Sequence, residues 1–448
     1  MKEKNNSLDV FENAPIGKAV MKNTVPAMLA MLMVLIYNLA DTFFIGKTNN
    51  ALMVASVSLV TPDFLLFMAL GTIFGIGGTS VISRAIGQGK NEYAKKVCSF
   101  CMWGCVAVGI VMTIIIFVFM NPILKLLGAS DETMLYAKQY LSIVTIAGPF
   151  VLISNCYANI IRTEGKAGMA MIGQLAGNLL NVILDPILIL LLGWNVVGAA
   201  IATAISNLVS AIYYICYFKF GKSMLSISIK DFSIKNNILK SVISIGIPAA
   251  LGDVLMSVSS IVLNAQMAKY GDMAVAGVGV AMKVTMITGM ICIGFGQGVQ
   301  PLLGYCIGAK NWKRYNASLR FSVIFGLGLS TVMTIICYIF DRQIVSAFLS
   351  DSEALSYGIE FSRILLTTSF LFGMFYVLSN ALQAMGAATS SLIVNISRQG
   401  LIYIPSIYIF QAILGIDGLL WAQPIADVLS VILVVILYKI SLKKLMKN

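Results

Sequence analysis

The stretch TIFGIGGTSVISRAIGQGKN at residues 72–91 returns later in the chain as IGFGQGVQPLLGYCIGAKN at residues 293–311. With one residue deleted from the second copy, Gly75 falls on Gly296 and two further pairs of glycines align. A shift of about 221 residues thus lays the second half of the chain on the first, which is the signature of a repeated architecture. This repeat decides the fold.

Two further segments repeat at nearly the same shift. CYANIIRTEG at 156–165 matches VLSNALQAMG at 377–386, and GAAIATAISNLVSAI at 198–212 matches GLLWAQPIADVLSVI at 418–432. The matched blocks occur in the same order in both halves, so the whole unit is duplicated rather than a single motif.

The composition is that of a membrane protein. Of the 448 residues, 58% are hydrophobic and 11% are charged, and the mean hydropathy is +0.89. A soluble domain cannot bury that much apolar surface. A membrane helix needs about 20 apolar residues, and barrel strands would alternate in polarity, which these runs do not. The predicted spans are 18–41, 51–75, 94–121, 136–160, 168–192, 197–219, 240–267, 274–300, 315–340, 355–382, 390–413 and 417–440.

Each copy of the repeat holds six of the twelve predicted spans. Because six is even, both copies enter the membrane from the same side, which makes a parallel repeat. We therefore predict an all-α integral membrane protein with twelve transmembrane helices in two six-helix repeats, related by a pseudo-two-fold axis along the membrane normal. The predicted parts are an N-terminal lobe (1–218), a cytoplasmic linker (219–240) and a C-terminal lobe (241–448).

The net charge of +12 is explained by where the basic residues fall relative to the predicted spans, so it does not indicate a nucleic-acid partner. With a cytoplasmic N-terminus, most Lys and Arg residues fall in inner segments or at inner span ends, as the positive-inside rule requires. This bias predicts a multi-pass protein of the plasma membrane with both termini in the cytoplasm. The basic residues that fall outside are Lys47, Lys125, Lys138, Lys269 and Arg342.

A carboxylate stands in the middle of an apolar run, NLLNVILDPILI at 178–189. Asp185 has Asn181 four residues before it and Asn178 seven before it, so the three share one helix face. Pro186 removes a backbone donor and frees a carbonyl one turn earlier. An acid in the hydrocarbon core is normally retained for a pathway, a partner or a proton. A hard-cation or proton site is predicted here; the alternative is an ordinary helix-end carboxylate.

Two other helices of the first half carry related side chains. Asp41 lies near the outer end of the first span with Asn38 three residues before it, and Thr203 and Asn207 share a face of the sixth span. The chain contains no histidine. A proton relay therefore has to use carboxyl groups, helped by hydroxyls, amides and water.

The second half has a different set of intramembrane charges. Asp253 lies five residues after Pro248, and Lys283 and Arg398 fall in later spans of the same half. Because charges inside a membrane seek partners, these three residues are predicted to form an acid–base network. Asp427 falls on Asn207 in the repeat, which suggests a position that lines a cleft.

The pattern excludes most enzyme classes and favours transport. GIGGTS at 75–80 lacks the Lys-Ser/Thr ending of a phosphate loop, and no nucleophile–base or metal set appears. Without a nucleotide-binding domain, energy has to come from an ion gradient. The 24 methionines and many aromatic residues suit an adaptable cavity for apolar cations. The alternatives are a flippase for lipid-linked saccharides or cell-wall precursors, in which Lys283 and Arg398 would bind pyrophosphate, and a passive channel.

With these residues in view, the chain resembles the multidrug and toxic compound extrusion (MATE) family over almost its whole length. Twelve helices in two six-helix repeats are that family's plan. IGFGQGVQPLLGYCIGAKNWKR at 293–314 is similar to the drug-exporter branch of Gram-positive bacteria. The other matching segments are Pro26 with YNLADTFFIG (37–46), GQGKNEYAKK (87–96), IRTEGKAGMAM (161–171) and NVILDPILI (181–189).

The resemblance implies an antiporter that exports organic cations in exchange for H+ or Na+, with no other cofactor. Tyr140 is similar in placement to a tyrosine near the family's coupling site, and Pro26 matches a first-helix proline whose bending is proposed to follow protonation. The coupling residues implied by the motifs are Asp41, Asn181, Asp185 and Thr203.

One position departs from the family pattern. Some relatives carry a glutamate in the seventh helix eight residues after its proline, where this chain has Met256 and the acid is Asp253. The resemblance therefore favours H+, or H+ and Na+ sharing the first-half residues. The prediction is a multidrug/H+ antiporter, with Na+ as the alternative coupling ion, that works by rocking-type alternating access as a monomer. Small organic cations and membrane lipids are its expected partners.

Overall fold

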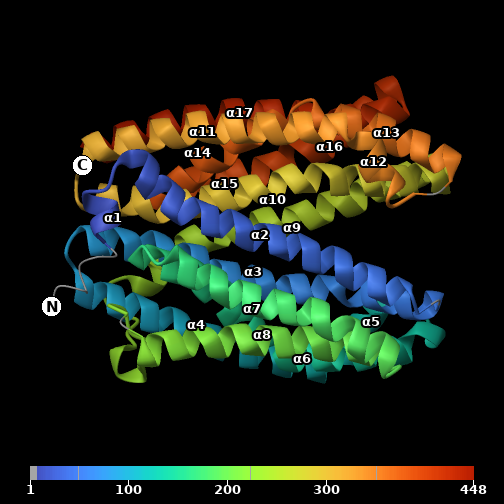
Figure 1. Ribbon diagram of the computed structural model, residues 1–448, viewed down its shortest axis with the longest axis horizontal. Helices are drawn as coiled ribbons and strands as arrows, with labels where there is room; N and C mark the ends of the chain where they lie inside the picture. Colours follow the sequence, from blue (N-terminus) through green and yellow to red (C-terminus); the bar gives the residue numbers. More distant parts are fainter. Residues whose placement is uncertain (1–7, 49, 222, 350, 448) are drawn as a thin grey trace. The chain divides into compact units, whose positions relative to one another are not determined.

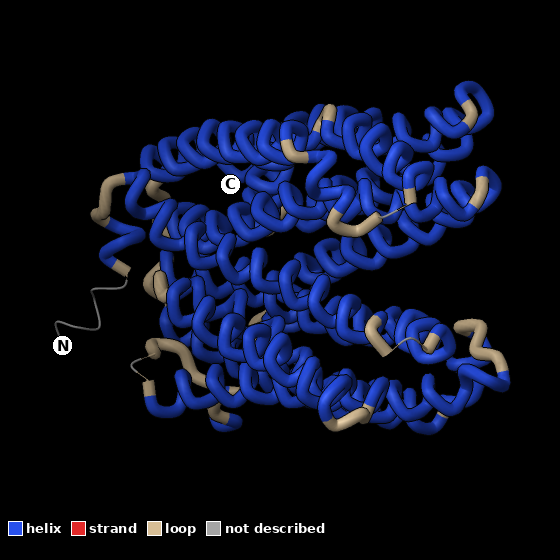
Figure 2. Tube along the Cα trace, turned by 45° about the vertical axis from the view of Figure 1, so that its right-hand side comes forward, coloured by secondary structure: helices blue, strands red, loops and turns tan. Residues whose placement is uncertain are grey.

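The computed structural model describes residues 8–48, 50–221, 223–349 and 351–447. Across these ranges the regular structure is entirely helical and contains no strand, and short loops join the helices (Figure 2). The first element is a single turn, α1 (Asp9–Glu12).

The helices are long and apolar enough for a membrane. Among the described residues, ten helices qualify as spans, and an eleventh is the pair Ser352–Leu366 and Ser369–Met385, bent by 42°. The run predicted at 390–413 is helical from Ala388 to Leu414, although Arg398 within it makes it more polar than the others. The predicted all-α membrane fold is confirmed.

The chain divides into two compact units. The first comprises Leu29–Gly246 and the N-terminal segment up to Glu12. Helix α6 is its centre, since α6 packs against α3, α4 and α8, and α7 packs on α8. Figure 1 shows these helices alongside one another. The elements are α2 (Ile16–Gly46), α3 (Ala51–Gly87), α4 (Asn91–Val118), α5 (Met120–Leu126), α6 (Asp131–Ile160), η2 (Ile161–Glu164), α7 (Ala167–Asp185), η3 (Pro186–Leu191), α8 (Asn195–Phe220) and η4 (Ile229–Asp231).

The second unit comprises Asn13–Met28 and Ile247–Asn448. Helix α10 packs against α11, α13 and α14, and α17 packs against α14 and α16. Helix α2 begins in this unit and ends in the first, a division that the sequence repeat did not predict. The elements are α9 (Ile238–Met267), η5 (Ala268–Tyr270), α10 (Asp272–Gly308), α11 (Trp312–Ile339), α12 (Asp341–Ser346), α13 (Ser352–Leu366), η6 (Ser369–Leu371), α14 (Phe372–Met385), α15 (Ala388–Ile396), η7 (Ser397–Ile402), α16 (Tyr403–Leu414) and α17 (Ile416–Lys447).

The glycine-rich repeat stretches continue their helices, so α3 and α10 extend well past the predicted ends at 75 and 300. The glycines allow neighbouring helices to approach closely, as small residues do in membrane proteins. A Cβ atom on Gly75 would lie 3.1 Å from the Cα atom of Cys156, and one on Gly296 would lie 2.6 Å from Nδ2 of Asn380. Glycine often marks the end of a helix, but the glycines of these stretches lie inside continuous helices and allow close packing instead.

A buried glutamate fastens the predicted linker to the first unit. Glu164 is 1% exposed and lies in η2. One carboxylate oxygen accepts from the Ser223 hydroxyl at 2.8 Å and from the Met224 backbone N–H at 2.6 Å. The other accepts from the Tyr217 hydroxyl at 2.6 Å. Three donors thus satisfy one buried acid, which fixes the start of the linker.

We expect Glu164→Gln to lower the melting temperature of the purified protein by roughly 5 °C, because charge-assisted hydrogen bonds each contribute about 1.5–3 kcal/mol. The matched control is Glu92→Gln, which removes the exposed pair with Lys95 at 2.7 Å and should change the melting temperature by about 1 °C or less. Equal shifts in the two variants would show that Glu164 does not hold the linker.

Candidate functional site

A polar cavity lies within the first unit, between helices α2, α3, α6, α7 and α8. The volume open to the centres of water molecules is about 50 Å³. One water molecule needs about 10–15 Å³ of such volume. The space therefore suits a few waters or a small ion, whereas drug-sized ligands occupy pockets of about 300–1,000 Å³. The lining residues are Val34, Tyr37, Phe64, Met68, Val151, Ser154, Asn155, Gln174, Asn178, Asn181, Thr203, Ser206, Asn207 and Ser210.

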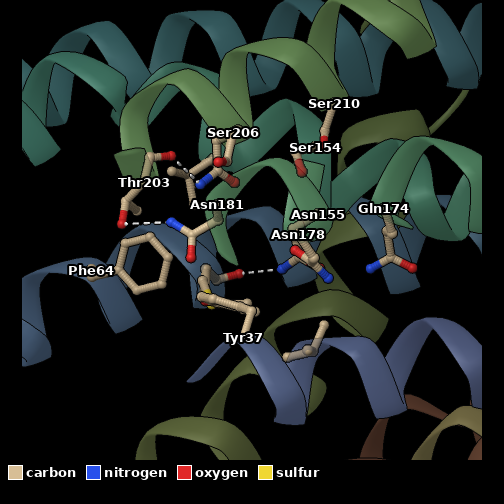
Figure 3. A pocket seen from close by; sticks show the side chains of 14 residues that line it. Tyr37, Phe64, Ser154, Asn155, Gln174, Asn178, Asn181, Thr203, Ser206 and Ser210 are labelled. Atoms are coloured by element: carbon tan, nitrogen blue, oxygen red, sulfur yellow. Dashed lines mark hydrogen bonds between the residues drawn. The ribbon is translucent and has the colours of Figure 1, made fainter. Parts of the chain in front are cut away.

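Three of the predicted polar residues meet at this cavity. Nδ2 of Asn181 donates to the Thr203 hydroxyl at 3.5 Å, as Figure 3 shows. Nδ2 of Asn207 donates to the Thr203 backbone carbonyl at 2.9 Å. Oδ1 of Asn181 is buried and has no hydrogen-bond partner. Helices α7 and α8 therefore together present amide and hydroxyl groups to the cavity, and Oδ1 of Asn181 remains available to accept a hydrogen bond.

Asp185 ends helix α7 one turn after Asn181 and is fully buried. Both of its carboxylate oxygens lack a hydrogen-bond partner. The helix continues from Pro186 as a π-helical turn, η3, because proline has no N–H to donate to the carbonyl of Val182. Burying a charged group without partners costs several kcal/mol (on the order of 2–7 for a neutral polar group alone), so this carboxylate requires a proton or a cation.

Asp41 lies in the same neighbourhood. The charge of Asp41 acts on Asp185, and both carboxylates act on the hydroxyl groups of Tyr37 and Tyr140. Oδ1 of Asp41 is buried without a hydrogen-bond partner. In low-dielectric surroundings like charges repel each other more strongly than in water. A proton or a cation would relieve that repulsion, while the two aspartates themselves stand outside the set of cavity-lining residues.

The remaining predicted residues of the first half take different places. Asn178 lines the cavity, and its Nδ2 is buried without a partner. Asn38 is half-buried, and its backbone carbonyl accepts from the Thr42 hydroxyl at 2.9 Å. Pro26 lies inside helix α2 in the segment that belongs to the second unit.

Several cavity residues were missed in the sequence. Gln174 extends the polar face of α7 one turn before Asn178, and this spacing was a readable signal. Asn155 on α6 donates to the Met68 carbonyl at 2.7 Å and to the Thr72 hydroxyl at 3.0 Å. Tyr140 is the residue of the same helix that the resemblance placed near the site, and no spacing pattern connects it with Asn155, so Asn155 was found only in the structure.

In the second half, Arg398 pairs with Asp427, a carboxylate that the predicted network did not include. Nε of Arg398 donates to Oδ1 of Asp427 at 2.9 Å, and both side chains are buried. Nζ of Lys283 lies 5.2 Å from the ring centre of Phe348. The structure therefore brings Arg398 together with Asp427, while Asp253 and Lys283 lie on other helices, α9 and α10.

The family model described as MatE matches residues 26–187 and again residues 248–409. The chain belongs to the MATE family. The second match begins and ends 222 residues after the first (26 to 248 and 187 to 409), which confirms the duplication that the glycine-rich stretch predicts.

Curated relatives support the same assignment. The chain is 33% identical over 425 residues to the multidrug export protein MepA of Staphylococcus aureus (strain MSSA476), covering 95% of this chain and 94% of the relative. It is 32% identical over 424 residues to the protein of the same name from Staphylococcus haemolyticus (strain JCSC1435), covering 95% and 93%. Both relatives come from Gram-positive bacteria, in agreement with the predicted branch.

Solved MATE structures share the fold. A MATE transporter in complex with MaL6 superposes with a TM-score of 0.94 at 25% identity, covering 99% of both chains. A multidrug resistance MATE transporter in an outward-facing conformation gives a TM-score of 0.93, also at 25% identity and 99% coverage. The all-helical arrangement is thus a known transporter fold.

Proposed function

We propose that this protein exports small organic cations across the plasma membrane in exchange for H+, with Na+ as the alternative coupling ion, by rocking-type alternating access. The family, the spans and the multidrug-export function of the named relatives support this proposal. The protein acts as a monomer with both termini in the cytoplasm, and it needs no cofactor besides the coupling ion.

The observation that carries the coupling proposal is Asp185. Its carboxylate is fully buried, both oxygens lack partners, and it stands one turn from a cavity of water size. A structural carboxylate would have donors around it, as Glu164 has. A carboxylate without donors suits a group that gains and loses a proton or a cation in each cycle.

Proton exchange couples to substrate through charge. With Asp41 and Asp185 deprotonated, the first unit carries negative charge in a low-dielectric region and attracts an organic cation. Protonation from outside neutralises these groups, weakens the attraction and releases the substrate. Loss of the proton to the cytoplasm restores affinity. Water molecules that enter the cavity, hydrogen-bonded to the amides of Asn181 and Asn207 in its lining, would provide a path for the proton.

The same residues fit Na+ as an alternative coupling ion. Hard cations prefer carboxylate, carbonyl and hydroxyl oxygens. Asp185 offers two free carboxylate oxygens, Asn181 offers Oδ1, and Thr203 offers its hydroxyl nearby. Protonation and Na+ binding would therefore compete at one place.

The flippase alternative finds no support at this site. A pyrophosphate carrier would need free cationic side chains around a large cavity, whereas this cavity is small and lined by amides, hydroxyls and apolar groups. Arg398, one of the two cations proposed for that role, is already paired with Asp427.

The test is efflux of a fluorescent organic cation from everted vesicles or proteoliposomes, with pH and Na+ gradients imposed separately. We expect uphill transport to follow the pH gradient and to persist without Na+. Transport that follows Na+ alone would make Asp41 and Asp185 metal ligands instead. Transport under neither gradient, in protein that unfolds cooperatively at its normal temperature, would contradict the proposed function.

A further inference from the structure

A buried arginine in the second unit is surrounded by the groups that recognise organic cations. Nε of Arg398 donates to Asp427 at 2.9 Å, and Nη1 donates to the Tyr376 hydroxyl at 2.9 Å. The guanidinium carbon lies 4.6 Å from the ring centre of Phe375 and 4.9 Å from that of Phe372. Carboxylates combined with aromatic faces are how proteins bind guanidinium and alkylammonium ions.

The carboxylate of this cluster is held in place by further donors. Nε2 of Gln423 donates to Oδ1 of Asp427 at 3.0 Å, and the Thr368 hydroxyl donates to Oδ2 at 3.4 Å. Asp427 is 2% exposed. Arg398 and Asp427 therefore satisfy each other's charge in place of water, as a buried ion pair must.

The internal repeat relates this cluster to the cavity of the first unit. Asn159 and Asn380 occupy matching positions in the repeat and make the same contact. Nδ2 of Asn159 donates to the carbonyl of Asn155 at 3.0 Å, and Nδ2 of Asn380 donates to that of Tyr376 at 2.8 Å. The geometry thus fixes the register between α6 and α14.

In this register, the three rings around Arg398 stand where the first unit has cavity walls. The matched pairs are Phe372 with Val151, Phe375 with Ser154, and Tyr376 with Asn155. Each first-unit member lines the cavity. At these three positions the second unit therefore has aromatic rings, where the first unit has an apolar, a hydroxyl and an amide side chain.

Arg398 and the residues on the Asp427 side of the cluster also have matching positions in the first unit. Arg398 falls on Gly177 or on its neighbour Asn178, depending on where the single gap between the repeats is placed. The other matched pairs are Asp427 with Asn207 and Gln423 with Thr203. The cluster around Arg398 is thus the second unit's counterpart of the cavity, and its space holds a side chain instead of water.

We propose that the second unit contains a cation site equivalent to the cavity of the first, formed by Asp427 and the rings of Phe372, Phe375 and Tyr376, and that Arg398 occupies it as a tethered guanidinium. The ligand class of this site is a compact organic cation. A covalently attached cation cannot leave during a transport cycle. If the proposed function holds, the first unit alone therefore exchanges the coupling ion, and the second keeps a permanent internal counter-ion.

The experiment is binding of methylguanidinium and tetramethylammonium to the purified Arg398→Ala variant, followed by its melting temperature. Removing one partner of the buried pair should lower the melting temperature by on the order of 10 °C. Each cation should then raise it saturably, with half-saturation on the order of 1 mM, and methylguanidinium should recover at least half of the loss. The unmodified protein should show at most the smaller shift that substrate binding to the first unit produces, because its second-unit site is filled.

Two variants keep this test decisive. Arg398→Lys retains a tethered cation and should neither lose as much stability nor bind the probes, while Arg398→Ala combined with Asp427→Asn should lose the saturable response. If Arg398→Ala folds only when methylguanidinium is present during expression and solubilisation, that dependence supports the site. Absence of a saturable shift, an equal shift in the unmodified protein or the double variant, or failure to fold with and without methylguanidinium would overturn it. The assay involves no transport, so failure of the proposed function would leave its outcome unchanged.

Discussion

Asp185→Asn is expected to abolish uphill efflux of organic cations while the protein remains folded. A pH gradient of about 1.7 units supplies about 2.3 kcal/mol for each proton exchanged, which supports an accumulation ratio of roughly 50. Without an ionisable group at position 185, that energy has no route to the substrate. The ratio should fall to about one in proteoliposomes with an imposed pH gradient.

The folded state should not suffer, because the amide has nearly the shape of the carboxylate and no charge. Both carboxylate oxygens of Asp185 lack donors, and burying a neutral amide costs less than burying a charge. We therefore expect the melting temperature of Asp185→Asn to equal or exceed that of the unmodified protein. This separates loss of coupling from loss of structure.

Asp131→Asn is the matched control. Asp131 is exposed in the first turn of α6, in the same unit. The same chemical change there should leave the accumulation ratio within about twofold, since exposed substitutions away from a site have small effects. Uphill accumulation by Asp185→Asn at the level of this control would remove Asp185 from the coupling mechanism.

The sequence predicted this site well along one helix and poorly across helices. The spacing of Asn178, Asn181 and Asp185 puts their side chains on one face of α7, and the structure buries that face with Asn181 and Asp185 on it. Nothing in the spacing indicates that Thr203 on α8 meets Asn181. That pairing came from the family resemblance, because contacts between helices depend on packing that a single sequence does not encode locally.

The two π-helical turns also show that local sequence predicts only part of the structure. Pro186 predicts that α7 cannot continue its normal hydrogen bonds, and η3 begins at that residue. The π-helical turn of the second unit, η7 (Ser397–Ile402), contains no proline. Its irregular turn holds Arg398 among aromatic rings, so tertiary contacts rather than local sequence stabilise it.

The partner of Arg398 illustrates how a repeat adds information that composition lacks. Intramembrane charge alone suggested Asp253 and Lys283 as partners. Asp427, 29 residues after Arg398 on α17, falls on Asn207 in the repeat. Asn207 lines the cavity of the first unit, and that correspondence was the signal for the pair of Arg398 with Asp427.

Gly177→Val is the second substitution with a large expected effect, because it tests whether close packing of α7 on α8 forms the site. A Cβ atom on Gly177 would lie 2.1 Å from Oγ of Ser210 and 2.7 Å from the Ser206 carbonyl oxygen. Atoms cannot approach so closely, and overfilling a packed core costs about 1–3 kcal/mol or more. Helix α7 must therefore move away from α8, which separates Asn181 from Thr203.

We expect Gly177→Val to lower the rate of gradient-driven efflux at least tenfold (~1.4 kcal/mol of lost function, within the cost of overpacking) and to lower the melting temperature. The control is Gly168→Val on the same helix, where a Cβ atom meets nothing within 4 Å. Valine has a slightly better helix propensity than glycine, so an intrinsic effect would favour both variants equally. A loss confined to Gly177→Val therefore has to come from the contact with α8. Equal activity of the two variants would mean that the meeting of Asn181 and Thr203 is not needed for coupling, and the proton or Na+ site would then reduce to the two carboxylates.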